Sequence, residues 1–307
     1  MTNEEVIPAI LRNMEYPTIL GMSLANVCCG KCVWCPIGRG IYTQRRDKFM
    51  TMDTVENIIR QFSPRPPKEI WFSENGESLL NPNFKEIVVK FRRAFPHASL
   101  RTASNMALMD EETSLFLLKT GFNWISFNID GADKESYRVT KGLDLDVVLK
   151  NVKALINNYN AVGSNAALVC NIFPAARYYA EIGEPHPELV DDTHATFQMM
   201  REIMARSGDC RIFCPFPLTW AKREEWKRPK WTRFCSGLPQ VWQKAFIDTD
   251  GNLYPCCVDY NSDYIYGNIN EDMLGNIWYG DRHVEFIKNI LLGDVDKIGK
   301  PCVWCQD

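Results

Sequence analysis

The chain has 307 residues, of which 46% are hydrophobic and 24% are charged, and its formal net charge is −3. This is the composition of an ordinary globular protein, long enough to bury a full core and to divide into a large and a small domain. The slight negative charge excludes the strongly basic surface through which proteins bind nucleic acid or anionic membranes.

The N-terminal residues 1–16 mix Glu, Arg and Asn with apolar residues, which differs from the pattern of a signal peptide. No apolar run in the sequence approaches the roughly 20 residues that cross a bilayer. We therefore expect a cytoplasmic protein with neither a membrane nor a nucleic-acid partner.

Segments with the periodicity of strands and of helices alternate along the first two thirds of the chain. We expect strands at residues 18–26, 69–72, 99–103, 124–129, 166–173 and 211–215, and helices at residues 52–62, 82–95, 111–118, 144–157 and 193–205. Six successive βα units predict parallel strands with right-handed crossovers. Six units instead of eight predict an α/β fold with a partial (β/α)6 TIM-like barrel, whose active site lies at the carboxyl ends of the strands.

The pattern changes after about residue 217. Residues 245–247 and 253–254 flank Asp248-Thr249-Asp250-Gly251-Asn252, which is typical of a hairpin turn, and residues 276–292 have helical spacing. We therefore predict three parts: an N-terminal segment at 1–17, the barrel at 18–227 and a small α+β domain at 228–307.

The chain contains twelve cysteines, which in a reducing cytosol indicate metal binding or catalysis more than disulfides. Cys28, Cys32 and Cys35 follow the first predicted strand with the spacing C-x3-C-x2-C. Three thiolates this close can hold three irons of a 4Fe–4S cluster and leave the fourth iron open to a small molecule. The alternatives are a zinc knuckle or buried cysteines. Zinc prefers four ligands, and Cys29 is too close to Cys28 to be an obvious fourth.

This motif, with the aromatic Trp34 before its last cysteine, resembles that of the radical S-adenosylmethionine (SAM) superfamily. The resemblance implies that Gly76 and Glu77, after the second strand, hold the SAM amino group, with Asn75 in place of the usual first glycine. It also implies SAM contacts from Trp34 in the cysteine loop, from Ser104, after the third strand, and from Asn128, where the family often has a serine. The Asp130-Gly131 pair that follows would by itself indicate only a turn.

The resemblance also implies the reaction. An external one-electron reductant such as flavodoxin or ferredoxin reduces the cluster, SAM is cleaved, and a 5′-deoxyadenosyl radical abstracts hydrogen from a substrate. The cofactors supply the difficult chemistry, and the protein orients them.

A second cysteine set occupies the C-terminal part. Cys235, Cys256, Cys302 and Cys305 resemble, in their spacing, the SPASM/twitch extension of radical SAM enzymes. The short C-terminal cysteine run implies the twitch form, with one auxiliary 4Fe–4S cluster ligated by all four thiolates. The alternative is a structural zinc site with the same ligands.

Cys257 follows directly after Cys256. In this position a thiol can donate a hydrogen atom to a substrate radical, although an alternative cluster ligand and a packing residue are the other interpretations. Asp259 is a weaker candidate for a base, and Cys170 is a candidate for a side chain that points into the barrel. Histidines such as His283 are expected at the surface or at helix ends.

The substrate class is inferred from what precedes the first strand. Peptide maturases of this family commonly carry an N-terminal recognition domain, whereas only a short segment stands here. We therefore expect a small polar substrate of the carbohydrate or aminocyclitol type, and either oxidation of an alcohol or epimerisation. The alternatives are a maturase of a ribosomally made peptide and, from another class, an iron–sulfur electron carrier or redox sensor.

Overall fold

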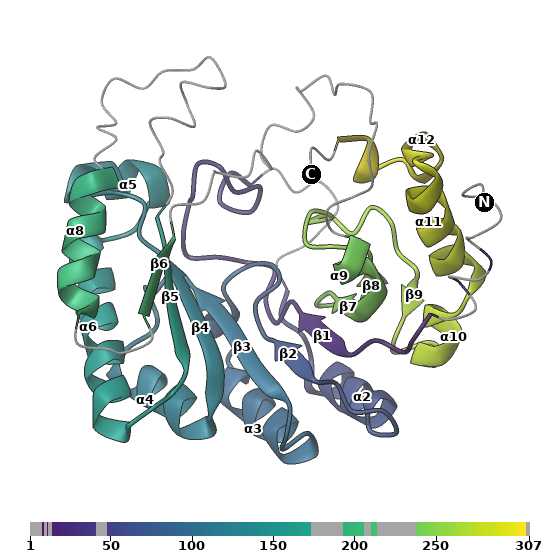
Figure 1. The fold of residues 1–307 in the computed structure, drawn as a ribbon, viewed down its shortest axis with the longest axis horizontal. Coiled ribbons are helices and arrows are strands. Elements are labelled where there is room, and N and C mark those ends of the chain that lie inside the picture. Colours follow the sequence, from purple (N-terminus) through teal and green to yellow (C-terminus); the bar gives the residue numbers. More distant parts are fainter. Residues whose placement is uncertain are drawn as a thin grey trace.

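A sheet of nine strands runs through the described part of the chain and is flanked by helices (Figure 1). The computed structural model describes residues 8, 11, 14–40, 48–172, 193–205, 210–213 and 238–304. The strands are β1 (Ile19–Met22), β2 (Glu69–Trp71), β3 (Ser99–Ser104), β4 (Phe122–Asn128), β5 (Ala167–Asn171), β6 (Cys210–Phe213), β7 (Lys244–Ile247), β8 (Asn252–Tyr254) and β9 (Gly267–Asn268).

The strands follow the order β6-β5-β4-β3-β2-β1-β7-β8-β9 across the sheet. From β1 to β6, each strand pairs in parallel with the next strand in sequence. Parallel neighbours joined by helical crossovers and left open at the edges form a partial TIM-like barrel, which confirms the predicted fold class.

The C-terminal hairpin extends the same sheet. Strand β7 is parallel to β1, and β8 and β9 then add antiparallel strands. The boundary predicted at residue 228 lies outside the described residues, so the division into three parts stays a prediction.

Helices connect the strands and cover the sheet. They are α2 (Met52–Phe62), α3 (Phe84–Ala94), α4 (Glu111–Thr120), α5 (Lys134–Lys141), α6 (Leu145–Val162), α8 (Thr193–Met204), α9 (Leu238–Gln243), α10 (Leu274–Trp278), α11 (Asp281–Leu292) and α12 (Val295–Ile298), with 3-10 turns η1 (Ser78–Leu80) and η3 (Cys302–Trp304). Several helices have an N-cap side chain that accepts a backbone N–H group from the first turn. Thr51 caps α2 in this way, and Asp110 caps α4. Gly121 ends α4 in the left-handed conformation.

Alternation along the strands separates a helix-facing side from an inner side. Leu20, Ile70 and Leu100 belong to the fully buried hydrophobic core. The residues next to them in sequence face inward, and there Gly21, Trp71 and Arg101 stand side by side in register. The inner side of the barrel is therefore partly charged and aromatic.

A buried ion pair fills the space above Gly21. The Lys244 ammonium lies 2.5 Å from Glu74 Oε1, and both side chains are nearly excluded from solvent. A Cβ on Gly21 would lie 2.5 Å from Glu74 Oε1 and from Lys244 Cε. Because buried charges need a partner, the absence of a side chain at residue 21 leaves the room that this pair requires.

Helices α9 and α12 were not predicted, and two further helical regions also differ from the predictions. The single helix expected at 276–292 is divided into α10 and α11. The chain turns at Gly280, where a Cβ would lie 2.5 Å from the Asn276 carbonyl oxygen. Helix α5 was not predicted; it begins at a capping box of Asp133 and Ser136 and ends at Gly142, with φ +63°.

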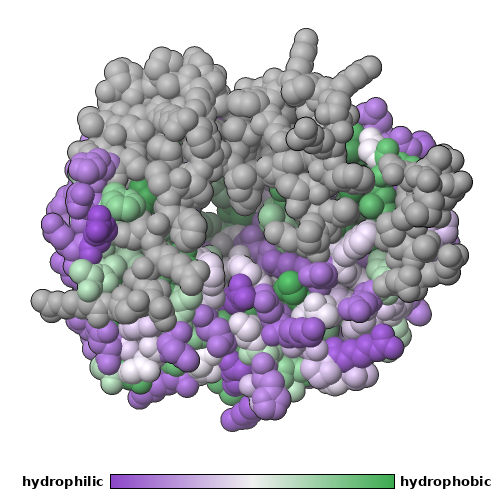
Figure 2. Space-filling model, viewed as in Figure 1, coloured by the Kyte–Doolittle hydropathy of each residue, from purple (hydrophilic) through white to green (hydrophobic). Residues whose placement is uncertain are grey.

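Within the described ranges, no helix combines the length and the apolar character that a membrane crossing demands. On the face shown in Figure 2, hydrophilic side chains cover much of the described surface. Exposed large hydrophobic residues such as Phe49 and Met273 belong to different parts of the fold. The cytoplasmic location stays a prediction.

Candidate active site

The loop that follows β1 brings the predicted cluster thiols together. A Cβ on Gly30 would lie 3.6 Å from the Sγ atoms of both Cys28 and Cys32, so these two thiols point toward the same space. The third cysteine, Cys35, follows Cys32 in a tight turn that is closed by the hydrogen bond from Cys35 N to Cys32 O (3.1 Å). All three are partly buried.

The chemistry of this donor set fits an iron–sulfur cluster. Among the described residues, no three Cys, His, Asp or Glu side chains converge tightly enough to hold a single metal ion. A cubane cluster instead takes thiolates at separate corners, and soft thiolates without carboxylates favour iron–sulfur sites. Burial raises the pKa of the Cys32 and Cys35 thiols. Coordination to a metal deprotonates such thiols.

Asn105, directly after β3, contacts the first two cysteines of the loop. Its side-chain amide donates to the Sγ atoms of Cys28 (3.4 Å) and Cys29 (3.3 Å). The Cys28–Cys29 hydrogen bond lowers the pKa of Cys29 to about 6 and raises that of Cys28. The amide therefore offers hydrogen bonds to sulfur where the cluster is expected, an interaction that tunes cluster potentials.

The sequence analysis did not predict a role for Asn105; the signal that could have found it is its position directly after Ser104, a predicted SAM contact. The next residue, Met106, adopts a left-handed φ of 68°. A non-glycine residue there costs about 1–2 kcal/mol. The Asn151 amide donates to the Met106 carbonyl oxygen (2.7 Å) and holds this conformation.

Gly76 is required by its backbone geometry. Its φ is +71°, and a Cβ would lie 2.2 Å from the Ala25 carbonyl oxygen and 2.7 Å from that of Val27. The next residue, Glu77, donates its backbone N–H to Val27 O (2.8 Å). This close approach fixes the Glu77 loop beside the cysteine loop, because any larger residue would push the two backbones apart.

The Glu77 carboxylate is buried at the centre of a set of donors. Its Oε2 accepts from Asn105 N (2.8 Å) and Ser104 Oγ (3.2 Å), and its Oε1 accepts from Leu79 N (3.4 Å). Burial raises its pKa to about 7, although these hydrogen bonds oppose the rise. Ser104, predicted to contact SAM, thus orients Glu77. A cationic ligand beside Glu77 would offset the energetic cost of burying its negative charge.

Asn75 has a partner of its own. Its amide donates to the Tyr254 hydroxyl (3.3 Å), which also lies 3.4 Å from Ser23 Oγ. All three residues are buried. The side chain that replaces the usual glycine therefore links the Gly76-Glu77 loop to β8, which leads into Cys256.

Trp34 and Asn128 are the other two predicted SAM contacts. Trp34 is 8% exposed and lies within the cysteine loop. Asn128 ends β4 on the inner side of the barrel, where its Oδ1 accepts from Asn171 Nδ2 (3.2 Å). Both assignments stay predictions.

The described part of the second cysteine set brings Cys256 and Cys302 together. Burial raises the pKa of the Cys256 thiol, and the nearby Cys257 and Cys302 thiols raise it further. Closely spaced thiolates repel one another, and metal coordination would relieve this repulsion. Cys235 and Cys305 lie outside the described residues, so a four-thiolate site stays a prediction.

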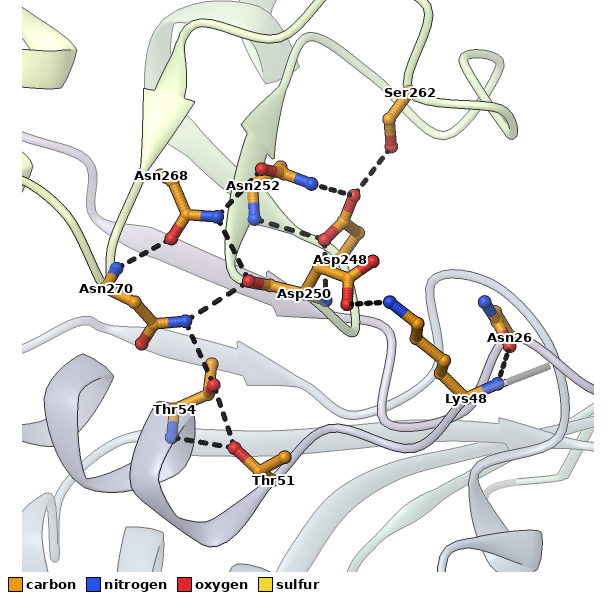
Figure 3. A network of polar contacts seen from close by, with 10 residues as sticks. All are labelled: Asn26, Lys48, Thr51, Thr54, Asp248, Asp250, Asn252, Ser262, Asn268 and Asn270. Carbon is orange, nitrogen blue, oxygen red and sulfur yellow. Dashed lines mark hydrogen bonds and ion pairs between the residues drawn. The ribbon is translucent and has the colours of Figure 1, made fainter. Parts of the chain in front are cut away.

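A polar network braces the hairpin that carries Cys256 (Figure 3). Asp248 accepts from the backbone N–H groups of Asp250 and Asn252 and from the Ser262 hydroxyl (2.9, 3.1 and 3.0 Å). Asn270 donates to Asp250 O and to Thr54 Oγ1 (both 3.1 Å), which ties the hairpin to α2. The network fixes β7 and β8 on the barrel.

The structure corrects one secondary prediction and qualifies another. Cys170 does not face the barrel interior; it is fully buried in the hydrophobic core, in register with core residue Phe127. Asp259 is buried, and its carboxylate accepts the N–H groups of Asp263 (2.7 Å) and Tyr264 (3.0 Å), so its role as a base stays a prediction. His283 lies in the first turn of α11, at a helix end as expected, but it is fully buried and not at the surface, and its Nδ1 lies 2.7 Å from the Trp278 carbonyl oxygen.

Two family models match the chain. The Radical SAM superfamily model matches residues 22–172, and SPASM, an iron–sulfur cluster-binding domain, matches residues 235–306. GTP 3′,8-cyclase from Clostridium botulinum (strain Okra) is 20% identical over 273 residues, which cover 80% of this chain and 82% of that protein. Molybdenum cofactor biosynthesis protein 1 from Dictyostelium discoideum is 21% identical over 173 residues. That match spans 53% of this chain but only about a quarter (27%) of the relative.

Solved structures share the fold. BtrN in complex with AdoMet and 2-DOIA matches with a TM-score of 0.59 and 17% identity, over 95% of this chain and 94% of that chain. Streptococcus suis SuiB bound to its precursor peptide SuiA matches with a TM-score of 0.60 and 16% identity, over 93% of this chain and 70% of that chain.

Proposed function

Because the chain belongs to the radical SAM superfamily and carries a SPASM domain, we propose that it is an oxidoreductase acting on a small polar substrate of the carbohydrate or aminocyclitol type. Its cofactors are 4Fe–4S clusters and SAM. When bound, they supply the 5′-deoxyadenosyl radical and an acceptor for a substrate electron. An external one-electron donor of the flavodoxin or ferredoxin kind would start each turnover.

The residues of the barrel have assigned tasks in this proposal. Cys28, Cys32 and Cys35 hold the SAM cluster. The Glu77 carboxylate accepts hydrogen bonds from the SAM ammonium, which would also lower its raised pKa. Gly76 sets the path of that loop, and the Asn128 amide donates to SAM from the end of β4.

One observation carries the substrate class: hydrogen-bonding side chains stand on the inner side of the barrel at the carboxyl ends of the strands. Asn128 and Asn171, which are only partly buried, contact each other at adjacent strand ends. A polar substrate needs such groups, because its hydroxyls lose water on binding. The match to BtrN, solved with 2-DOIA, supports this class, and the match to SuiB, solved with its precursor peptide, supports the peptide alternative.

We favour oxidation over epimerisation. In oxidation, the substrate would lose a hydrogen atom from carbon, the hydroxyl proton to solvent or a base, and one electron, so that a carbonyl forms; SAM, when bound, would supply the hydrogen-atom acceptor, and an auxiliary cluster would supply the electron acceptor. In epimerisation, Cys257 would instead return a hydrogen atom to the opposite face, and its sulfur radical would then take up one electron and one proton. Oxidation requires no residue beyond the cluster ligands.

The test is substrate screening in deuterated water. Reduced enzyme and SAM are incubated with polyols and aminocyclitols, with GTP and short peptides as competing classes, and 5′-deoxyadenosine is measured. We expect a response to the first group and a carbonyl product without solvent deuterium. Inversion with one deuterium incorporated, abolished in Cys257→Ala, would replace oxidation by epimerisation.

The other two classes make distinct predictions. A peptide maturase responds only to peptides. An electron carrier or redox sensor forms no 5′-deoxyadenosine with any compound.

A further inference from the structure

Helix α5 runs directly beside the cysteine loop and binds it through the backbone. Lys31 N donates to Lys141 O (2.7 Å), and Val33 N donates to Thr140 O (3.0 Å). These two hydrogen bonds bracket Cys32. Gly142, with φ +63°, allows this contact, because a Cβ there would lie 2.9 Å from the Lys31 Cβ.

Lys141, the last residue of α5, is a buried cation. Its side chain is 3% exposed, and its ammonium lies 2.7 Å from Asp130 Oδ2, which is fully buried. Burying two charges is costly, and a buried ion pair often contributes little net stability. The pair therefore calls for an explanation in function.

The neighbour of this pair is the cluster loop. The Lys141 side chain is hydrogen-bonded to the Cys32 thiol, and the buried carboxylate of Asp130 lies on the other side of the Lys141 ammonium. A Lys⁺ and an Asp⁻ are thus held at fixed positions beside one predicted ligand of the cluster. The low dielectric of this buried site strengthens their electrostatic interaction with the cluster.

We propose that Lys141 is a positioning residue that faces the Cys32 thiolate and raises the reduction potential of the SAM cluster, with Asp130 holding its ammonium in place. This rests on cluster binding by Cys28, Cys32 and Cys35. Reduction adds one electron to the cluster, and a nearby cation stabilises the added charge. Net charge and hydrogen bonds to sulfur are established determinants of cluster potentials.

The experiment compares Lys141→Met, Asp130→Asn and a matched control, Lys134→Met. Lys134 lies on the same helix but forms an exposed pair with Asp146. Each reconstituted full-length protein is assayed for iron, and its cluster potential is then measured by redox titration with electron paramagnetic resonance. The signal that changes when SAM is added belongs to the three-cysteine cluster. No substrate is needed, so a wrong substrate class would not affect the result.

We expect Lys141→Met to lower the ratio of reduced to oxidised cluster about tenfold at the wild-type midpoint, which corresponds to about 59 mV for one electron. Asp130→Asn should raise the ratio, and Lys134→Met should leave it within about twofold. A Lys141→Met potential equal to that of the wild type would overturn the proposal, as would shifts in one direction for both buried-pair variants. If Lys141→Met retains no iron, the test depends on Asp130→Asn alone. A ratio of reduced to oxidised cluster that does not rise in Asp130→Asn would then overturn the proposal.

Discussion

Replacing Glu77 with Gln would remove the charge of the predicted SAM-ammonium site with little change in shape. The Gln oxygen can still accept a hydrogen bond from Asn105 N or Ser104 Oγ, so the loop beside Gly76 should stay in place. A hydrogen bond to a charged group contributes about 1.5–3 kcal/mol, so the dissociation constant for SAM should rise about ten- to hundredfold.

The assay is anaerobic calorimetric titration of SAM into the reconstituted, oxidised enzyme, in which SAM is bound but not cleaved. Glu112→Gln is the matched control, because Glu112 is exposed and pairs only with Lys85 in the contacts described. Both variants should retain the wild-type iron content. A Glu77→Gln variant that keeps its iron and binds SAM within twofold of the wild type would refute the assigned role.

Three further predictions concern the clusters, the glycine and the buried histidine. Triple replacement of Cys28, Cys32 and Cys35 by Ala should reduce iron from about eight to about four atoms per chain, and loss of all or none would contradict two independent sites. Gly76→Ala should destabilise the protein by more than the ~1–2 kcal/mol of the left-handed backbone, because two carbonyl oxygens must move, and an unchanged melting temperature would contradict this. Burial lowers the pKa of His283 to about 4, below its unfolded value, so its contribution is complete above about pH 6.5 and is lost as pH falls toward 4. The loss is about 3 kcal/mol, and His283→Phe should unfold with a weaker pH dependence over that range, as followed by anaerobic thermal melts.

The barrel could be predicted because its signals are local. Helix α2 begins and ends at the predicted residues, since Thr51 caps it and its apolar spacing is regular. Helix α5 was missed because it is short and mostly polar, and its residues are ordered in part by hydrogen bonds to the distant cysteine loop.

The cysteine spacing likewise identified the cluster loop, but contacts between distant residues could not be predicted. Asn75 looked like a departure from a motif, and its reason is Tyr254, far along the chain. Asp130 looked like a turn residue until its partner Lys141 was located. Cys170 was assigned to the wrong face of β5, because the facing of a strand depends on its register with β4.

The most direct test of the whole account is the cleavage of SAM itself. Anaerobically reduced wild-type enzyme with a full iron load should convert SAM into 5′-deoxyadenosine and methionine in equal amounts. A small polyol or aminocyclitol substrate should accelerate the conversion, and Cys32→Ala should abolish it. A fully loaded wild type that forms no more 5′-deoxyadenosine than Cys32→Ala, with every compound tested, would contradict the account.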